Sequence, residues 1–190
     1  MALLNDRPDA LVAARLPLVD REQAPLTVRD LYPSDRDASN ITKTLAGSPD
    51  TLGALAPFLA QVMNPTTLDL ATKEVVVLRV SAVNRCAYCV PTHELAARRA
   101  GLSPRAVAAL ASPQPPAAAL EGAHRVLARY CDQLVADAGS VDDALLAELR
   151  GHFEDHEIVE LTVLAGAITM LNYVAGVAAP PLDPWTVAER

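Results

Sequence analysis

The chain has 190 residues, of which 51% are hydrophobic and 21% are charged, and its formal net charge is −7 at pH 7. This length is enough for one domain with a full hydrophobic core, and the composition is that of a globular protein rather than a disordered one. The negative charge and the lack of a basic stretch argue against nucleic-acid binding, because such binding needs cations that neutralise phosphates.

The first twenty residues lack the pattern of a secretory signal peptide. They contain Asp6, Arg15 and two prolines, and they have no continuous apolar region. The most hydrophobic segment, residues 158–179, is long enough to span a bilayer, but it contains Glu160 and Asn172 and has no basic flanks. We therefore expect a buried helix rather than a membrane span, and a cytoplasmic protein.

Helix start and stop signals recur along the chain, whereas no segment alternates apolar and polar residues as an exposed strand does. Ser48-Pro49 combines a capping residue with a proline at the first helical position, and Gly101 suits the end of a helix. The apolar run 75–78 could form a buried strand, but the helical spacing that continues beyond it favours a helix. The predicted helices cover residues 49–62, 68–83, the cysteine segment up to 100, 104–110, 117–136, a segment that starts at 140–143, and 155–175.

These elements predict an all-α fold in a single domain. The domain covers residues 23–176, after an N-terminal arm at 1–22 and before a C-terminal tail at 177–190. The tail is expected to be irregular because prolines at 180, 181 and 184 interrupt it. Within the helical bundle, the cysteine segment is expected near the N-terminus of a central helix.

Two of the three cysteines form a Cys-x-x-Cys pair, Cys86 and Cys89, with His93 after it. On a helix these three side chains fall within an arc of roughly 60°, and Cys89 and His93 are i, i+4 neighbours. A histidine there can accept the thiol proton or stabilise the thiolate, which is the reactive species. Pro91 places both cysteines within or just before the first helical turn, because proline deep inside a helix costs about 3 kcal/mol.

Glu74 and Tyr88 complete the candidate site. Glu74 lies on the preceding predicted helix, and an antiparallel turn would bring it back beside the cysteines. A buried carboxylate near thiols can act as a proton acceptor or relay, although most helical glutamates are simply exposed. Tyr88 lies between the cysteines, and its hydroxyl is expected to find a nearby polar partner.

Other uses of a Cys-x-x-Cys pair are less consistent with this sequence. A zinc site could take His93 as third ligand, but a fourth is not evident, because Cys131 and His124 lie on a distant helix. Thioredoxin-like exchange needs βαβ units that the chain does not offer. Cys131 has the apolar context of a buried small residue. We therefore expect no metal and no cofactor.

The spacing Glu74-x11-Cys86-x2-Cys89-x3-His93 resembles the signature of the alkylhydroperoxidase D (AhpD)-like proteins of the carboxymuconolactone decarboxylase superfamily. Further segments resemble the same family, namely residues 15–22, 40–49, 64–68, 101–103 and 155–161. Together with the signature they extend the resemblance over most of residues 15–185. It implies an all-helical bundle that assembles into homo-oligomers, often trimers or hexamers.

The resemblance also implies a thiol peroxidase in antioxidant defence. In such a protein Cys89 attacks a hydroperoxide, Cys86 resolves the sulfenic acid to a disulfide, and Glu74 and His93 relay protons. A dithiol reductant, either a lipoylated or a thioredoxin-like protein, then reduces the disulfide. Tyr88 stands where some of these peroxidases carry a relay histidine, so it joins the candidate catalytic residues, with slower or differently routed proton transfer.

Two alternatives stay open at this point. A carboxymuconolactone decarboxylase-like lyase would use Glu74 and His93 for proton transfer and would not need the cysteines. A non-enzymatic helical oligomer would keep the motif as a structural or metal-bearing element. One further departure from the family is Asn172-Tyr173, which stands where many relatives have Asn-Arg, and it affects a subunit contact or a pocket wall.

Overall fold

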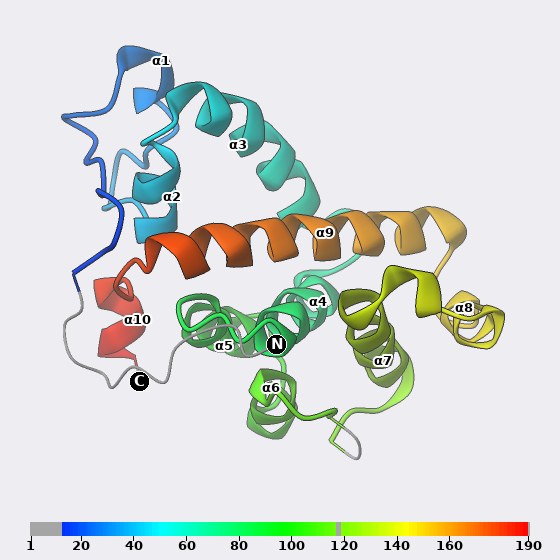
Figure 1. Ribbon diagram of the computed structural model, residues 1–190. Coiled ribbons are helices and arrows are strands. Elements are labelled where there is room, and N and C mark those ends of the chain that lie inside the picture. The colour runs from blue at the N-terminus through cyan, green and yellow to red at the C-terminus, as the bar shows by residue number, and fades with distance from the viewer. Residues whose placement is uncertain (1–12, 117–118, 190) are drawn as a thin grey trace.

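The structure, a computed structural model, describes residues 13–116 and 119–189, and all regular elements in this part of the chain are helical (Figure 1). This confirms the predicted all-α fold. The elements are α1 (Leu26–Arg29), α2 (Asn40–Leu45), α3 (Pro49–Met63), α4 (Leu70–Val83), α5 (Cys89–Arg99), α6 (Pro104–Ala111), α7 (Gly122–Ala136), a 3-10 turn η1 (Ala138–Ser140), α8 (Asp143–Arg150), α9 (Asp155–Ala178) and α10 (Pro184–Ala188).

Helix α4 lies at the centre of the bundle. Every residue from Val75 to Ala82 is buried, and the helix contacts α5, α6, α7 and α9 (Figure 1). The apolar residues of the run 75–80 point to several sides of α4, so other elements have to enclose the helix, because any exposed side would leave apolar surface in water. The run 75–78 is therefore part of a core helix, and α4 is the frame on which α5 and its cysteines are placed.

Two cations are buried on α4, and each is paired. The ammonium of Lys73 lies 2.6 Å from the Glu160 carboxylate and donates a 3.0 Å hydrogen bond to the Val62 carbonyl. The guanidinium of Arg79 pairs with the Asp132 carboxylate and donates to two backbone carbonyls. Because an unpaired buried charge is strongly unfavourable, these pairs fix the position of α4 against α9 and α7.

Glu160 makes the stability of the fold depend on pH in acid. Burial alone would raise the pKa of the Glu160 carboxyl, but hydrogen bonds from Lys73 and Thr66 outweigh burial, and the pKa lies below its ordinary value. A lowered folded-state pKa contributes stability above the unfolded pKa of about 4.3, and this contribution is lost as the pH falls through the folded pKa. We expect Glu160→Gln to be less stable at neutral pH and to lose less stability on acidification. Urea unfolding at a series of pH values measures both effects, and parallel pH profiles for the two proteins would contradict this.

Helix α9 runs across the whole molecule (Figure 1). Within the described residues it is the one helix long and apolar enough to cross a membrane by length and composition, with a mean hydropathy of 1.7. One side is buried in the core and includes Leu161, Leu164 and Ile168. The other side exposes large apolar residues, among them Val163 and Tyr173. The predicted burial therefore holds for one face of the helix only.

Three predicted helix ends are wrong. Helix α7 begins at Gly122 rather than at 117, because the left-handed φ of 51° at Gly122 stops a right-handed helix from extending backwards; residues 117 and 118 lie outside the described part. Helix α9 continues past 175 and ends before Ala179, which is left-handed with a φ of 46°. Pro184 begins α10 instead of ending regular structure, because proline fits the first position of a helix.

Candidate active site

A tight turn after α4 delivers the cysteine segment. Asn84 caps the helix, Arg85 adopts a left-handed conformation with a φ of 54°, and the Cys86 amide donates a 2.9 Å hydrogen bond back to the Ser81 carbonyl. A left-handed non-glycine residue costs about 1–2 kcal/mol, so the surrounding contacts hold this turn in place. The turn reverses the chain, and α5 packs back against α4 as predicted.

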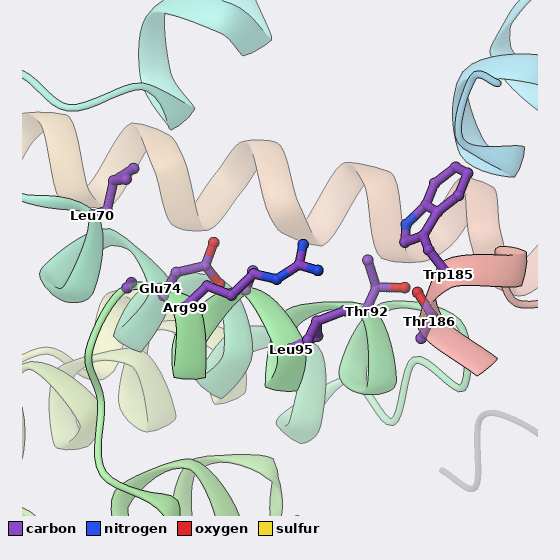
Figure 2. Close-up of a pocket in the computed structure, with 9 residues that line it drawn as sticks. Leu70, Glu74, Thr92, Leu95, Arg99, Trp185 and Thr186 are labelled. Carbon is purple, nitrogen blue, oxygen red and sulfur yellow. The ribbon is translucent and has the colours of Figure 1, made fainter. Parts of the chain in front are cut away.

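Glu74 and His93 meet across the two helices. The imidazole Nδ1 of His93 lies 3.0 Å from Oε2 of Glu74, and both side chains are largely buried. Glu74 also lines a cavity of about 320 Å³ between α4, α5 and α10 (Figure 2). With Nδ1 held by the carboxylate, Nε2 is the nitrogen through which His93 can exchange a proton with a bound molecule. The pair therefore has the composition of a proton relay beside a cavity.

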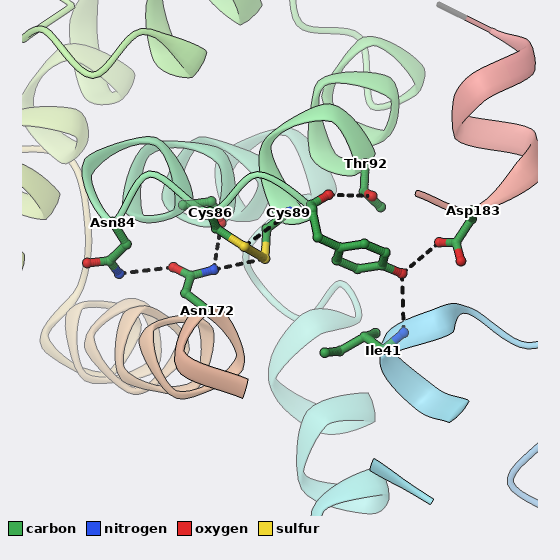
Figure 3. Close-up of a disulfide and its surroundings, with 9 residues drawn as sticks. Ile41, Asn84, Cys86, Cys89, Thr92, Asn172 and Asp183 are labelled. Atoms are coloured by element: carbon green, nitrogen blue, oxygen red, sulfur yellow. Dashed lines mark hydrogen bonds between the residues drawn. A yellow bond between two sulfur atoms is a disulfide. The ribbon is translucent and has the colours of Figure 1, made fainter. Parts of the chain in front are cut away.

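Cys86 and Cys89 are joined by a disulfide at the N-terminus of α5 (Figure 3). Cys89 is the first residue of the helix, as Pro91 predicts, and its backbone N–H donates a 3.2 Å hydrogen bond to Sγ of Cys86. The two residues are 2% and 7% exposed. When the disulfide is open, the helix N-terminus stabilises negative charge on these sulfurs and favours the thiolate form.

Asn172 on α9 is the residue of this site that sequence reasoning missed. Its side-chain amide donates hydrogen bonds to Sγ of Cys89 at 3.1 Å and to Oγ of Ser81 at 3.2 Å (Figure 3). Its Oδ1 accepts a 2.9 Å hydrogen bond from Asn84, which turns the amide NH₂ group toward the sulfur. Asn172 is 1% exposed. Such a buried donor stabilises a Cys89 thiolate more than the neutral thiol, and so lowers the thiol pKa.

The sequence carried one signal for this role. Asn172 interrupts the apolar segment 158–179, and a buried amide in an apolar helix needs hydrogen-bond partners. In the sequence the residue served only as an argument against a membrane span and as the neighbour of Tyr173. Its partners lie 83 and 91 residues away along the chain, so the pattern alone did not identify them.

Tyr88 turns away from the sulfurs. Its hydroxyl donates a 2.7 Å hydrogen bond to Oδ2 of Asp183 and accepts a 3.3 Å hydrogen bond from the Ile41 amide (Figure 3). Asp183 is 1% exposed, and its other oxygen accepts a 2.7 Å hydrogen bond from the Asn40 amide. Tyr88 and Asp183 therefore connect the cysteine segment, α2 and the segment before α10.

This arrangement bears on the predicted relay role of Tyr88. Burial, followed by the hydrogen bond to the Asp183 carboxylate, raises the pKa of the phenol far above its ordinary value. The hydroxyl stays protonated, and its proton is engaged by Asp183. In the described part of the chain, His93 likewise has no hydrogen bond to either sulfur, so a relay from Cys89 to His93 requires a bound molecule or water between them.

Cys131 is separate from the site. It is a free, fully buried thiol on α7, and burial raises its pKa to about 12. This agrees with the prediction of a buried small residue. Among residues 13–116 and 119–189, no group of three or more histidine, cysteine, aspartate or glutamate side chains is placed to hold a metal ion.

Residues 49–138 match the model of the carboxymuconolactone decarboxylase family. This segment runs from the start of α3 into η1 and contains Glu74, both site cysteines and His93. A comparison with curated protein sequences gave no significant match.

Several solved structures have the same fold as this chain. An uncharacterized peroxidase-related protein from Silicibacter sp. TM1040 has a TM-score of 0.79 and 22% identity, over 95% of this chain and 96% of that chain. An alkylhydroperoxidase AhpD core protein, an uncharacterized peroxidase-related protein from Ralstonia eutropha JMP134, has a TM-score of 0.82 and 21% identity, over 93% and 96%. A variant of the debrominase Bmp8 in complex with 2,3,4-tribromopyrrole has a TM-score of 0.72 and 15% identity, over 93% and 97%.

At these identities the solved structures establish the fold, and the family match adds the evidence from sequence. The fold is all-α, forms a single domain and is AhpD-like, with the Cys-x-x-Cys pair at the start of a helix in the middle of the bundle. The resemblance seen in the sequence is confirmed: residues 49–138 belong to the carboxymuconolactone decarboxylase family, and the chain has the AhpD-like fold.

Proposed function

We propose that this protein is a thiol-dependent peroxidase that reduces hydroperoxides through a dithiol–disulfide cycle of Cys86 and Cys89. The observation that carries the proposal is the placement of these two sulfurs. They are close enough to be bonded, they lie at a helix N-terminus, and Cys89 faces the amide donor of Asn172. Each of these features favours a thiolate that can be oxidised and then resolved.

The proposed cycle has two chemical steps before the reductant acts. The Cys89 thiolate attacks the distal oxygen of the hydroperoxide; an S–O bond forms, the O–O bond breaks, and the departing alkoxide takes a proton to become an alcohol. Cys86 then attacks the sulfenic acid sulfur of Cys89, so that the S–S bond forms and the S–O oxygen leaves as water. The His93–Glu74 pair supplies and accepts the protons of these two steps through the bound peroxide or water.

A dithiol reductant returns the two electrons and regenerates both thiols. Because both cysteines are almost fully buried, the reductant has to bring a thiol into a narrow space. The slender arm of a lipoylated protein suits this, and a thioredoxin-like protein is the second candidate. We place this cycle in the cytoplasm, where the prevailing reducing conditions make a Cys-x-x-Cys pair a redox site rather than a permanent link.

The direct test is hydroperoxide consumption by the purified protein with a panel of dithiol donors. Wild type is compared with Cys86→Ser, Cys89→Ser and the matched control Cys131→Ser, whose cysteine is remote from the site. The proposal is supported if Cys86→Ser and Cys89→Ser lose activity while Cys131→Ser keeps it. Lyase activity on a lactone acid that survives both substitutions would replace it with the decarboxylase-like alternative. A parallel assay with the same donors offers 2,3,4-tribromopyrrole in place of the hydroperoxide, because the debrominase Bmp8 shares the fold.

We also propose that the outer face of α9 pairs with a second copy of this chain. Exposed and half-buried residues on this face recur at intervals of four and three, as in helix-pairing seams. They are Val159, Val163, Gly166, Met170, Tyr173 and Val177. The set is symmetric about residue 168, so two antiparallel copies would place Met170 over Gly166 and Tyr173 over Val163. Such two-fold pairing fits a hexamer built from dimers and not an isolated trimer.

We expect Val163→Glu to separate this assembly, because a buried, unpaired carboxylate in the seam is strongly unfavourable. Light scattering after size-exclusion chromatography should give a smaller mass for this variant than for wild type. Val187→Glu is the matched control, since Val187 is similarly exposed but lies on α10. A monomeric wild type, or an unchanged mass for Val163→Glu, would refute the pairing.

A further inference from the structure

The cavity beside Glu74 has the make-up of a small-molecule site. Its volume of about 320 Å³ is at the lower end of the range for such sites. Leu70, Leu95 and Trp185 give it apolar walls, while Glu74 and Arg99 bring one charge of each sign (Figure 2). The cavity is thus apolar along its walls, with a guanidinium available for an anionic group.

Several residues of α5 that line the cavity share a helical side with Cys89, although Cys89 itself does not line it. The lining residues Thr92, Ala96 and Arg99 follow Cys89 by three, seven and ten positions, which on a helix is one side. A molecule that lies along this side therefore extends from the guanidinium toward the helix N-terminus. Glu74 lines the cavity and also holds His93, so the relay pair reaches the space that such a molecule fills through its carboxylate.

Arg99 already pairs with a carboxylate, and this ion pair is exposed to solvent. The guanidinium pairs with the side chain of Glu189, just after α10, and the two side chains are 61% and 45% exposed. Exposed pairs of this kind contribute little and exchange readily. A guanidinium presents several N–H donors in a plane that matches a carboxylate, so an incoming carboxylate can share or replace Glu189.

We propose that this cavity binds small organic acids with an apolar body, the carboxylate on Arg99 and the hydrocarbon against Leu95 and Trp185. Combined with the proposed peroxidase function, on which this part rests, the preferred substrates are alkyl hydroperoxides that carry a carboxylate. In that orientation the hydrocarbon leads from Arg99 toward the Glu74–His93 pair and Cys89. Glu189 is then an internal competitor for the carboxylate.

The chain contains a single tryptophan, Trp185, so its fluorescence reports occupation of this cavity. The probes are octanoate, 1-octanol and octylammonium, which share a chain and differ in charge. Octanoate is expected to give a saturable change in emission and to bind at least about tenfold more tightly than the other two. Isothermal titration calorimetry on the same samples detects binding that leaves the emission unchanged.

Two substitutions at exposed positions are expected to act in opposite directions. Arg99→Gln should weaken octanoate binding by about tenfold or more and leave octanol binding unchanged. Glu189→Gln should tighten octanoate binding by up to about fivefold, because the competing carboxylate is removed. Equal affinity for octanoate and octanol, an unchanged affinity in Arg99→Gln, or no binding by either method overturns the proposal.

The binding test does not depend on the peroxidase reaction. Octanoate binding without hydroperoxide consumption would leave the cavity assignment in place and remove the proposed function. Hydroperoxide consumption without octanoate binding, and with equal kcat/KM for neutral and carboxylate-bearing hydroperoxides, would leave the proposed function in place and remove the cavity assignment.

Discussion

Replacing Cys89 with serine is expected to slow the first oxidation by hydroperoxide by at least about 1,000-fold, as removal of a nucleophile typically does. A serine hydroxyl stays protonated at neutral pH and cannot take up the peroxide oxygen. Cys86→Ser is expected to retain this first step but to lose turnover, because no second thiol resolves the sulfenic acid. Stopped-flow oxidation of the reduced proteins measures the first step, and trapping with dimedone followed by mass spectrometry locates the sulfenic acid.

The two variants together test which cysteine attacks the peroxide and which one resolves, as well as whether the reaction occurs. The Cys89 amide donates to Sγ of Cys86, and the Asn172 amide donates to Sγ of Cys89, so each sulfur has one stabilising donor. A sulfenic acid trapped on Cys86 in the Cys89→Ser variant, formed at the wild-type rate, would reverse the proposed roles. The Cys131→Ser control should match wild type in both measurements, since that thiol is fully buried elsewhere.

Replacing Asn172 with leucine is expected to raise the pKa of the Cys89 thiol by about 1–2 units. A hydrogen bond to a charged group is worth about 1.5–3 kcal/mol, and one pKa unit corresponds to about 1.36 kcal/mol. The pKa rises because the Asn172 donor stabilises the thiolate, so that its removal favours the neutral thiol. Below the wild-type pKa the oxidation rate of the variant should be about 10- to 100-fold lower than that of wild type, and the difference should shrink and vanish as the pH rises above the new pKa.

The pH profile separates this effect from a loss of structure. Oxidation rates from neutral to alkaline pH, with thiolate absorbance in the ultraviolet, give the pKa of the wild type and of the variant. Asn84→Ala is the matched control, because it removes the group that orients the Asn172 amide but leaves the donor itself, and it should shift the pKa less. A uniformly slow Asn172→Leu protein at every pH, or an unshifted pKa, would contradict the assigned role.

The helices of this chain were predictable where local signals mark their ends. Ser103 shows this well: it accepts a hydrogen bond from the Ala106 amide and precedes a proline at the first helical position. Pro91 placed Cys89 at the start of α5 for the same local reason, and the shared turn then brought His93 to Glu74. These features depend on residues close together in the sequence, or on one reversal of the chain.

Other parts of the site depend on how distant segments pack, and the pattern of the sequence did not determine them. The contact between Asn172 and Cys89 requires the register of α9 against α4 and α5, across 83 positions. The contact between Tyr88 and Asp183 spans 95 positions and depends on a segment that was expected to be irregular because of its prolines. A buried asparagine and a buried aspartate can be identified as unusual from sequence, but their partners are a property of the assembled bundle.

The residues around the disulfide come from two segments of the chain, one inside the family match and one after it. The family match ends at residue 138, so it includes the cysteine pair and excludes Asn172, Asp183 and Trp185. A fragment trimmed to the matched borders would keep every residue of the signature and lose the amide behind Cys89, the anchor of Tyr88 and one wall of the cavity. Homologues that share the signature can therefore differ in reactivity through the segment that follows the match, and a comparison restricted to the motif would not detect the difference.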